Sequence, residues 1–255
     1  HLTEDELSPH SLDVLQKWKN IPDIVYSINS NIRQQLIQTK VYQRNKLQKE
    51  VSGISCRMCE KAEESVMHLM SSCSAISQGL YKARHDRMLR PLYHLLLQKY
   101  EFADNDHDLP WYKQRSPFPV VENGHAKVIW DTEIWVDPKP ANNANKPDMI
   151  IFDKEENKCI LIEGSVCTVD QIKDRTLTKQ NKYSELRYGI KRLFGMGEVQ
   201  QINIVFDFLG GFHKRLLQDL KILSDSQAAN IKIAQNCQRW ILSQNCEIIK
   251  TFSHT

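Results

Sequence analysis

The first hundred residues have apolar side chains at helical spacing. Between residues 11 and 49 they recur every three or four positions, first at Leu12, Leu15 and Trp18. Pro22 permits a new helix start, and the run after it consists of Ile24, Ile28, Ile32, Leu36 and Ile37. This spacing predicts an amphipathic helical pair. A third long helix is predicted over residues 76–100, with a buried side formed by Leu80, Met88, Leu89, Leu92, Leu95 and Leu96.

Strand-like patterns begin only beyond Glu101. Residues 104–119 are rich in Asp, Asn and Pro and predict a loop. Strands are predicted over residues 127–136, 149–152, 158–162 and 202–208, and helices over residues 171–194, 214–223 and 227–245. The polar residues 153–157 predict a hairpin between the two central strands. Strands in succession, then a helix and a further strand, predict an α/β fold in which helices flank a mixed sheet.

This change of pattern divides the 255 residues into three segments. We expect a helical linker over residues 1–50, a cysteine-rich unit with the following helix over residues 51–100, and an α/β domain over residues 101–255. No run of about 18 or more apolar residues occurs, so we expect no membrane partner. Because the sequence begins with His1 rather than Met, we expect a fragment of a longer polypeptide.

The cysteine-rich unit has the spacing of a structural zinc site. Cys56 and Cys59 are separated by two residues, and His68 and Cys73 follow with four residues between them. Three thiolates and one imidazole complete a tetrahedral zinc site with no open position for catalysis. The alternative is a set of unbound core cysteines, but it requires all four ligands to fall by chance within one short polar segment.

Net charge and the remaining cysteines add less specific information. The net charge of +3 is by itself a weak argument for a polyanionic partner. Basic residues flank the zinc unit, and they form either a solvated face or a phosphate-binding surface. They are Lys40, Arg44, Lys46, Lys49, Lys82, Arg84, Arg87 and Arg90. The remaining cysteines have apolar surroundings and are predicted to be buried thiols, which indicates a reducing, intracellular compartment. They are Cys159, Cys167, Cys237 and Cys246.

Two carboxylates are expected at one edge of the sheet. Asp148 precedes the first strand of the predicted hairpin, and Glu163 ends the second. The start of one strand and the end of its hairpin partner lie at the same edge, so the two side chains should meet there. Such a pair can hold Mg²⁺ or Mn²⁺, which activates water against a phosphodiester. Acids also end strands without any such role, and Glu133, considered as a third acid, is expected to be a surface residue.

The helix after Glu163 has two lysines on its apolar side. At about 100° per residue, a stripe about 120° wide contains Lys179, Lys182, Tyr183, Leu186, Ile190, Leu193 and Phe194. A buried ammonium group is costly without an anionic partner, and the two acids offer one. A lysine beside them can orient the attacking water or stabilise charge on the phosphate. Alternatively, the lysine stems pack while the ammonium groups reach water.

In this order, the motifs resemble the C-terminal region of non-LTR retrotransposon polyproteins that carry a restriction-like endonuclease. The resemblance covers nearly the whole chain. It rests on the knuckle of Cys56, Cys59, His68 and Cys73, on Arg84-His85-Asp86, on Lys146-Pro147-Asp148, on Glu163 and on residues 179–183. It implies a restriction-endonuclease-like mixed sheet of the PD-(D/E)xK type, preceded by a helical segment and a CCHC zinc knuckle.

The resemblance also implies an activity. The domain would nick genomic target DNA and free a 3′ end, from which a reverse transcriptase copies element RNA in target-primed reverse transcription. Asp148 and Glu163 would bind the catalytic Mg²⁺ or Mn²⁺, while the Zn²⁺ would be structural and its knuckle would help to bind nucleic acid. The implied partners are a DNA target and the reverse transcriptase region of the same polyprotein, with element RNA as a further candidate, and the implied location is nuclear.

One position departs from the pattern of restriction enzymes. These enzymes have a lysine two residues after the second acid, where this chain has Ser165. The retrotransposon family is similar to this chain in having its lysine on the next helix. The resemblance therefore gives the role to Lys182 or to Lys179, with Tyr183 beside it. Arg84 would contact phosphate or the active site, unless it is an exposed helical arginine.

Two other functions remain open. One is a catalytically weak nucleic-acid-binding module that keeps the nuclease fold for positioning. The other is a resolvase-like enzyme that acts on branched DNA. Hydrolysis of nucleotides is not favoured, because the sequence has no glycine-rich loop of the kind that binds phosphates.

Overall fold

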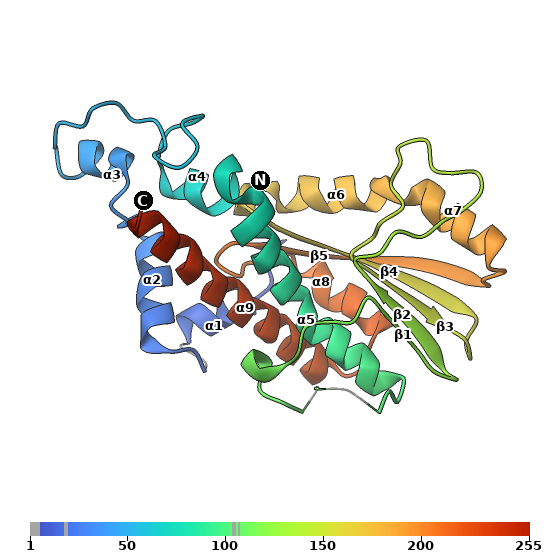
Figure 1. The fold of residues 1–255 in the computed structure, drawn as a ribbon. Coiled ribbons are helices and arrows are strands. Elements are labelled where there is room, and N and C mark those ends of the chain that lie inside the picture. Colours follow the sequence, from blue (N-terminus) through green and yellow to red (C-terminus); the bar gives the residue numbers. More distant parts are fainter. Residues whose placement is uncertain (1–5, 18–19, 104–105, 107) are drawn as a thin grey trace.

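A five-stranded mixed sheet forms the centre of the fold (Figure 1) in the computed structural model, which describes residues 6–17, 20–103, 106 and 108–255. The strands lie side by side in chain order and are β1 (Val120–Glu122), β2 (Ala126–Trp130), β3 (Met149–Asp153), β4 (Lys158–Cys167) and β5 (Glu198–Asp207). Neighbours from β1 to β4 are antiparallel, whereas β5 is parallel to β4. The predicted mixed sheet and the hairpin of β3 and β4 are confirmed.

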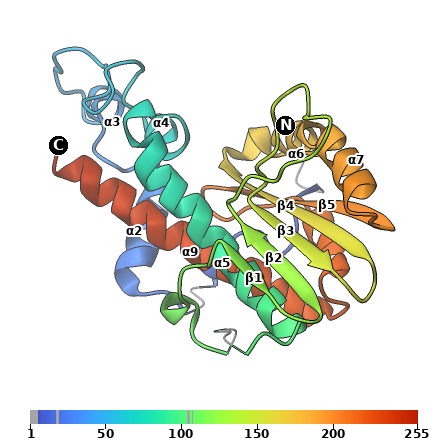
Figure 2. The ribbon, with the colours of Figure 1, turned by 45° about the vertical axis from the view of Figure 1, so that its right-hand side comes forward.

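Helices cover both faces of the sheet (Figure 2). On one face lie α6 (Ile172–Lys182) and α7 (Ser184–Leu193), and on the other lie α5 (Lys82–Lys99) and α9 (Gln227–Ser253), while α8 (Arg215–Asp219) packs beside β5. Successive residues of a strand point to opposite faces. Met149 and Ile151 therefore join the core beneath α5 and α9, and Ile150 and Phe152 pack toward α7. The predicted α/β class with flanking helices is confirmed.

The N-terminal helices pack on α9 rather than on the sheet. α1 (Asp13–Gln16) and α2 (Asp23–Arg33) share a core cluster with α9 that consists of Val14, Leu15, Ile21, Val25, Leu242 and Cys246. The helical pair predicted over residues 11–49 is therefore confirmed only in part. α2 ends at Arg33 and leaves Leu36 exposed, and a separate short helix, α3 (Lys40–Asn45), follows. Trp18 and part of the predicted 104–119 loop lie outside the described residues.

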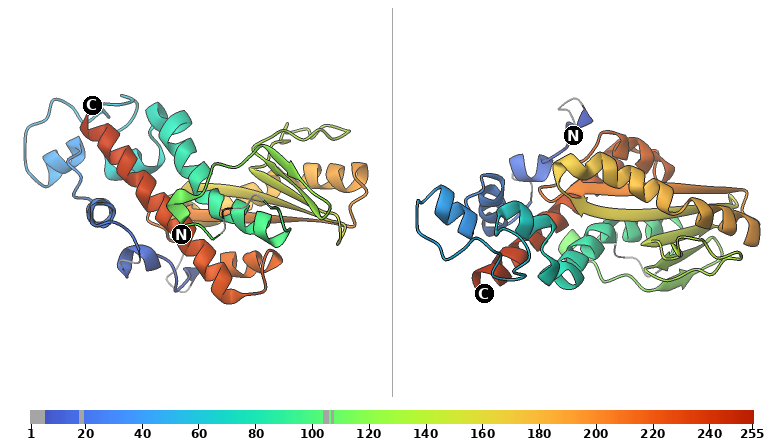
Figure 3. Two further views of the ribbon diagram at one scale, coloured as in Figure 1. Left: turned by 60° about the horizontal axis from the view of Figure 1, so that its bottom comes forward. Right: turned by 90° about the horizontal axis from the view of Figure 1, so that it is seen from above.

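The cysteine-rich unit connects α3 to α5. It contains α4 (Val66–Ser71), a 3-10 turn (Ser74–Ile76) and one turn of π-helix (Ser77–Tyr81). The C-terminal part of α9 lies beside this unit in every view, including Figure 3, and shares a core cluster with it. The helix predicted from residue 76 thus begins as irregular turns. Its predicted buried side is confirmed in α5 at Met88, Leu89, Leu92, Leu95 and Leu96.

The segment predicted as one helix over residues 171–194 is two helices. α6 ends at Lys182, and α7 begins at Ser184. Tyr183 separates them with φ −107° and ψ 17°, and its buried hydroxyl donates to the carbonyl of Lys146 at 2.9 Å. The break therefore turns Tyr183 toward a neighbouring loop. At the end of α7, Leu193 and Phe194 are exposed rather than buried.

Several boundaries also differ from the predictions. The strand predicted over residues 127–136 ends at Trp130, and residues 131–148 form an irregular segment, here named the 131–148 loop. The short strand β1 was not predicted, and α9 continues eight residues beyond residue 245. Further 3-10 turns lie at Trp111–Lys113, Val169–Gln171 and Leu220–Ile222. In the described part of the chain, no helix combines the length and the apolar character needed to cross a membrane.

Candidate functional site

Four potential metal ligands converge beside α4. The sulfur atoms of Cys56, Cys59 and Cys73 and one ring nitrogen of His68 all lie within 4.8 Å of one another. Cys56 Sγ is 4.0 Å from Cys73 Sγ, and Cys59 Sγ is 3.2 Å from His68 Nε2. Around a tetrahedral zinc ion, such atoms lie about 3.5–3.8 Å apart, because Zn–S is about 2.3 Å and Zn–N about 2.0 Å. The predicted ligand set is thus brought together and can bind a metal such as zinc.

Hydrogen bonds from neighbouring residues orient these ligands. Ser65 caps α4 by accepting from the backbone N–H of His68 at 3.1 Å. The second ring nitrogen of His68 lies 3.3 Å from Ser72 Oγ, which leaves Nε2 directed at Cys59. The hydroxyl of Tyr81 accepts from Cys73 N at 3.0 Å and donates to Leu69 O at 2.8 Å. The ligand side chains are therefore fixed by the fold around them.

A buried ion pair supports the same unit. Glu64 is fully buried, and its two carboxylate oxygens accept from the guanidinium of Arg57 at 2.9 and 2.7 Å. The backbone N–H groups of Arg57 and Lys40 also donate to Glu64, each at 2.9 Å. Because Lys40 begins α3 and Arg57 lies between two ligands, this carboxylate connects α3 to the cysteine knuckle.

The two predicted acids meet where β3 begins, but Glu163 lies within β4, which continues to Cys167, and not at the end of its strand as predicted. Met149 of β3 pairs with Ile162 of β4, so Asp148 and Glu163 are the next residues beyond that pair. The backbone N–H of Asp148 donates to Glu163 Oε2 at 3.2 Å, and that of Gly164 donates to Asp148 Oδ2 at 2.7 Å. Hairpin register alone is therefore sufficient to place the carboxylates together.

Both predicted lysines reach the same carboxylate from α6. Lys179 and Lys182 each donate to Glu163 Oε1, Lys182 at 3.3 Å and Lys179 at closer range. Lys182 also donates to the hydroxyl of Tyr183 at 2.6 Å. Glu163 is 1% exposed, whereas the lysine side chains are partly exposed. The apolar stems thus lie along the protein while the ammonium groups contact an acid at the sheet edge.

His85 is also a member of this site, although the Arg84-His85-Asp86 motif gave it no role of its own. Its Nε2 lies 3.0 Å from Asp148 Oδ2, and its Nδ1 lies 3.0 Å from Asp86 Oδ1. Burial disfavours the charged imidazole, but the negative charge and hydrogen bond of Asp148, together with Asp86, raise the pKa of His85 to about 10. Burial likewise opposes ionisation of Asp148, but the charge and hydrogen bond of His85 lower the pKa of Asp148 to about 2. The two groups therefore form a charged pair near neutral pH.

Gly164 explains how α5 comes close enough for this pair. A Cβ atom at this position would lie 3.0 Å from His85 Nε2, from Leu89 Cδ1 and from Met88 Cε. Real Cβ atoms rarely approach other atoms this closely, so a side chain at residue 164 would require these α5 side chains to shift by a few tenths of an ångström. The missing side chain lets His85 pack directly over the strand.

Arg84 is placed differently from either expectation. Its side chain is 2% exposed, and its guanidinium donates to Met70 O at 2.7 Å and to Asn245 Oδ1 at 3.0 Å. It also lies over the ring of Tyr81, with 5.0 Å between the guanidinium carbon and the ring centroid. The predicted contact with phosphate or the active site and the exposed alternative are both wrong for this structure. Arg84 instead connects α4, α5 and α9.

We therefore expect Arg84→Met to lower the free energy of unfolding by about 3 kcal/mol, because buried acceptors at Met70 and Asn245 lose their donors. Urea denaturation measures this change. Arg87→Met is the matched control on the same helix, since Arg87 is only half-buried and lies over the ring of Trp240 at 5.5 Å. Equal losses in the two variants would contradict the structural role of Arg84.

Of the other charged residues that were considered for the site, some form ion pairs and some are exposed to solvent. Lys82 and Lys146 both pair with Asp131, at 3.1 and 3.0 Å, at the start of the 131–148 loop. Glu133 is exposed, as predicted. Before the knuckle, Arg44, Lys46 and Lys49 are exposed, and Lys40 Nζ donates to Ser55 O at 2.8 Å. The cysteines outside the knuckle are buried, as predicted, and these are Cys159, Cys167, Cys237 and Cys246.

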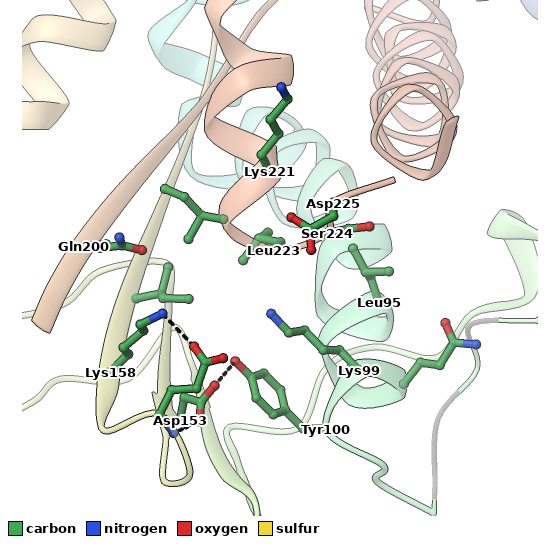
Figure 4. A pocket seen from close by; sticks show the side chains of 14 residues that line it. Leu95, Lys99, Tyr100, Asp153, Lys158, Gln200, Lys221, Leu223, Ser224 and Asp225 are labelled. Atoms are coloured by element: carbon green, nitrogen blue, oxygen red, sulfur yellow. Dashed lines mark hydrogen bonds and ion pairs between the residues drawn. The ribbon is translucent and has the colours of Figure 1, made fainter. Parts of the chain in front are cut away.

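A separate cavity lies at the opposite end of the β3–β4 hairpin. Its volume is 660 Å³, and Figure 4 shows Lys99 and Lys158 on two sides of it. Below them, Tyr100 donates to Asp153 Oδ2 at 3.0 Å. The residues that line it include none of the acids or lysines predicted for the site. The candidate acid–lysine site is therefore separate from this cavity.

The acid–lysine site differs from the knuckle in one further respect. Among the described residues, only the knuckle brings three or more Cys, His, Asp or Glu ligand atoms within such short mutual distances. The carboxylates of Asp148 and Glu163 instead contact the cationic groups of His85, Lys179 and Lys182.

In comparisons with known proteins, no family model matches the chain and no curated protein is significantly similar to it.

Proposed function

We propose that this chain is a metal-dependent DNA endonuclease of the PD-(D/E)xK type that nicks target DNA for a non-LTR retrotransposon. The observation that supports this most directly is the convergence on Glu163. The backbone N–H of Asp148 and the ammonium groups of Lys179 and Lys182 all donate to its carboxylate. Two acids on adjacent strands and a lysine from the next helix are the groups that the resemblance requires.

The residues fit a divalent cation by their chemistry. Carboxylate oxygens are the ligands that Mg²⁺ and Mn²⁺ prefer, and Asp148 and Glu163 offer them at one edge. When bound, such an ion would supply Lewis-acid activation of water and neutralise charge on the phosphate. Lys179 and Lys182 already point their ammonium groups at this edge, where they can orient the water or bind a nonbridging phosphate oxygen.

Restriction enzymes have a lysine two residues after the second acid, and its absence at residue 165 of this chain is consistent with the proposal. Ser165 lies two residues after Glu163 on β4, on the same side of the strand. The contacts of Lys179 and Lys182 with Glu163 put ammonium groups beside the second acid from α6 instead. We propose that these two lysines take the role that a lysine at residue 165 would have.

A second function is favoured by the same contacts. Because His85 pairs with Asp148 and both lysines pair with Glu163, the negative charges of the acids are balanced by protein groups. A module that binds nucleic acid without cutting it would keep this arrangement as a structural network. The proposed endonuclease differs from it by a requirement for Mg²⁺ or Mn²⁺.

Supercoiled plasmid tests the proposal. We expect the wild type to convert it to the nicked form with Mg²⁺ or Mn²⁺ and not when both are omitted. Glu163→Gln should slow nicking by about 100-fold or more, as for loss of one group that stabilises charge in the transition state. Glu155→Gln, an exposed acid in the turn between β3 and β4, is the matched control. No nicking by a wild type that binds the plasmid would favour the non-cutting module, and strong preference for branched DNA would favour the resolvase-like enzyme.

A further inference from the structure

A row of three hollows follows the line along which the 131–148 loop meets α7. The loop and the helix run in opposite directions, so the hollows succeed one another from the end of α6 to the end of α7. We name this row the seam. Its hollows have volumes of 240, 380 and 510 Å³ and lie at residues 142–146 with Lys182, at residues 137–140 with Tyr188, and at Trp135 with Phe194.

The seam is held in place by direct bonds between loop and helix. Arg192 donates to Asp137 O at 3.0 Å, and Ala141 N donates to Glu185 Oε2 at 2.6 Å. Midway along, a Cβ at Gly189 would lie 3.0 Å from Val136, so the two backbones approach closely. A preformed surface of this kind loses little conformational entropy when it binds a partner.

Aromatic side chains project from the seam into solvent. Trp135 is 69% exposed and Tyr188 is 67% exposed, although large aromatic side chains are usually buried to a greater extent. Phe194 is 43% exposed, and its ring packs against that of Phe152 with centroids 5.2 Å apart. Exposed rings on a fixed support are suited to stack with the flat faces of nucleic-acid bases.

Cationic residues lie between these rings. Lys139 and Lys191 are exposed, as is Arg192, and Arg187 is half-buried. Of the five acids on the same segments, Asp131 and Asp148 pair with cationic side chains and Glu185 accepts a backbone hydrogen bond, leaving Glu133 and Asp137 as surface carboxylates. The balance of charge favours a polyanion over an apolar protein partner, because alternating rings and cations match bases and phosphates.

We propose that the seam binds single-stranded nucleic acid and leads it to the acid–lysine site. Its first hollow is lined by Lys182 and Tyr183, and Lys182 contacts Glu163 directly. From Ser184 to Leu193, α7 alone is about 14 Å long, at about 1.5 Å per residue, which is long enough for a few nucleotides. Binding by the seam stands on its own, whereas delivery of the strand to Asp148 and Glu163 rests on the proposed endonuclease function.

Fluorescence anisotropy with a labelled oligo-dT of about 12 nucleotides tests the binding. We expect Trp135→Ala and Tyr188→Ala each to weaken binding by roughly 5- to 100-fold, the range for loss of one stacked base. Tyr112→Ala is the matched control, because Tyr112 is 60% exposed but lies outside the seam. Lys139→Gln should lower the slope of log affinity against log salt by about 0.7, the value for one phosphate contact on a single strand.

The binding measurement is separable from cutting. It is made with wild type and with Asp148→Asn in a buffer without Mg²⁺ or Mn²⁺, so that loss of nicking alone leaves the binding result unchanged. Affinity equal to wild type in both aromatic variants would overturn the assignment of the seam. Equal losses of affinity for blunt duplex and for single strand would overturn it as well, because stacking on unpaired bases would then contribute nothing.

Discussion

Asp148→Asn is expected to slow plasmid nicking by about 100- to 1000-fold, the range for removing one group that stabilises transition-state charge. The substitution removes the negative charge that a divalent cation requires but keeps an oxygen that can accept from Gly164 N. It also removes the anionic partner of His85, so the pKa of His85 should fall toward its usual value. Initial rates of nicking, measured with Mg²⁺ and with Mn²⁺, give the size of the effect.

Asp131→Asn is the matched control for this prediction. Asp131 is also an acid near the sheet edge, and it pairs with Lys82 and Lys146, but it does not contact Glu163 in the described structure. Its loss should change nicking by less than about 10-fold, as expected for a partly exposed charge outside the proposed metal-binding pair. Thermal unfolding of both variants is needed to confirm that they fold. Comparable rates for Asp148→Asn and wild type would refute the assignment of Asp148.

Cys56→Ser is expected to reduce bound zinc from about one equivalent per chain to nearly none and to unfold the knuckle. Structural zinc contributes about 10–16 kcal/mol of apparent binding free energy in small zinc-finger peptides, and much of it is folding free energy. The unit between α3 and α5 has only the six-residue helix α4 as regular α-helix, so we expect its folding to depend on the metal. Metal analysis and limited proteolysis between residues 46 and 73 measure the two effects.

Cys246→Ser provides the matched control for zinc loss. Cys246 is also a buried thiol, and its sulfur donates to Leu242 O at 3.4 Å, a bond that a serine hydroxyl can replace. This variant should keep its zinc and resist protease as the wild type does. Wild-type protein that contains no zinc after purification would contradict the knuckle, and the acid–lysine site would be unaffected by that result.

Features set by neighbouring residues were predictable from the sequence. The zinc ligands lie within one short segment, so their spacing alone indicates that they meet. The acids are brought together by a hairpin, and the hairpin was visible as two apolar runs around a polar turn at residues 153–157. The position of Lys179 and Lys182 follows from helical periodicity on α6. In each case, local rules fix the geometry.

Features set by packing between distant segments were not predictable. His85 meets Asp148 across 63 positions of sequence, and Arg84 meets Asn245 across 161. Helical periodicity predicts which face of α5 is buried but does not identify its partner. The signal that could have found His85 is its place in Arg84-His85-Asp86, where a histidine flanked by charged residues lies on a helix that must cross the sheet.

Breaks and short elements were also missed for physical reasons. The interruption at Tyr183 depends on a hydrogen bond to Lys146, a residue on a loop whose course the sequence pattern does not specify. The strand β1 has only three residues, too few for an alternating pattern to be recognised. The seam was not foreseen because a helical stripe containing Phe194 predicted burial there, and the helix ended before that side chain could be covered.

The close approach of α5 to β4 also restricts how this sequence can diverge. At residue 164, every residue except glycine would bring a Cβ atom to 3.0 Å from three side chains of α5, so substitution there is disfavoured while the acid–histidine pair is kept. The adjacent residue, Ser165, already has a Cβ atom and is half-buried. In a saturation-mutagenesis library selected for a folded product, tolerance should therefore change sharply between these two neighbouring codons.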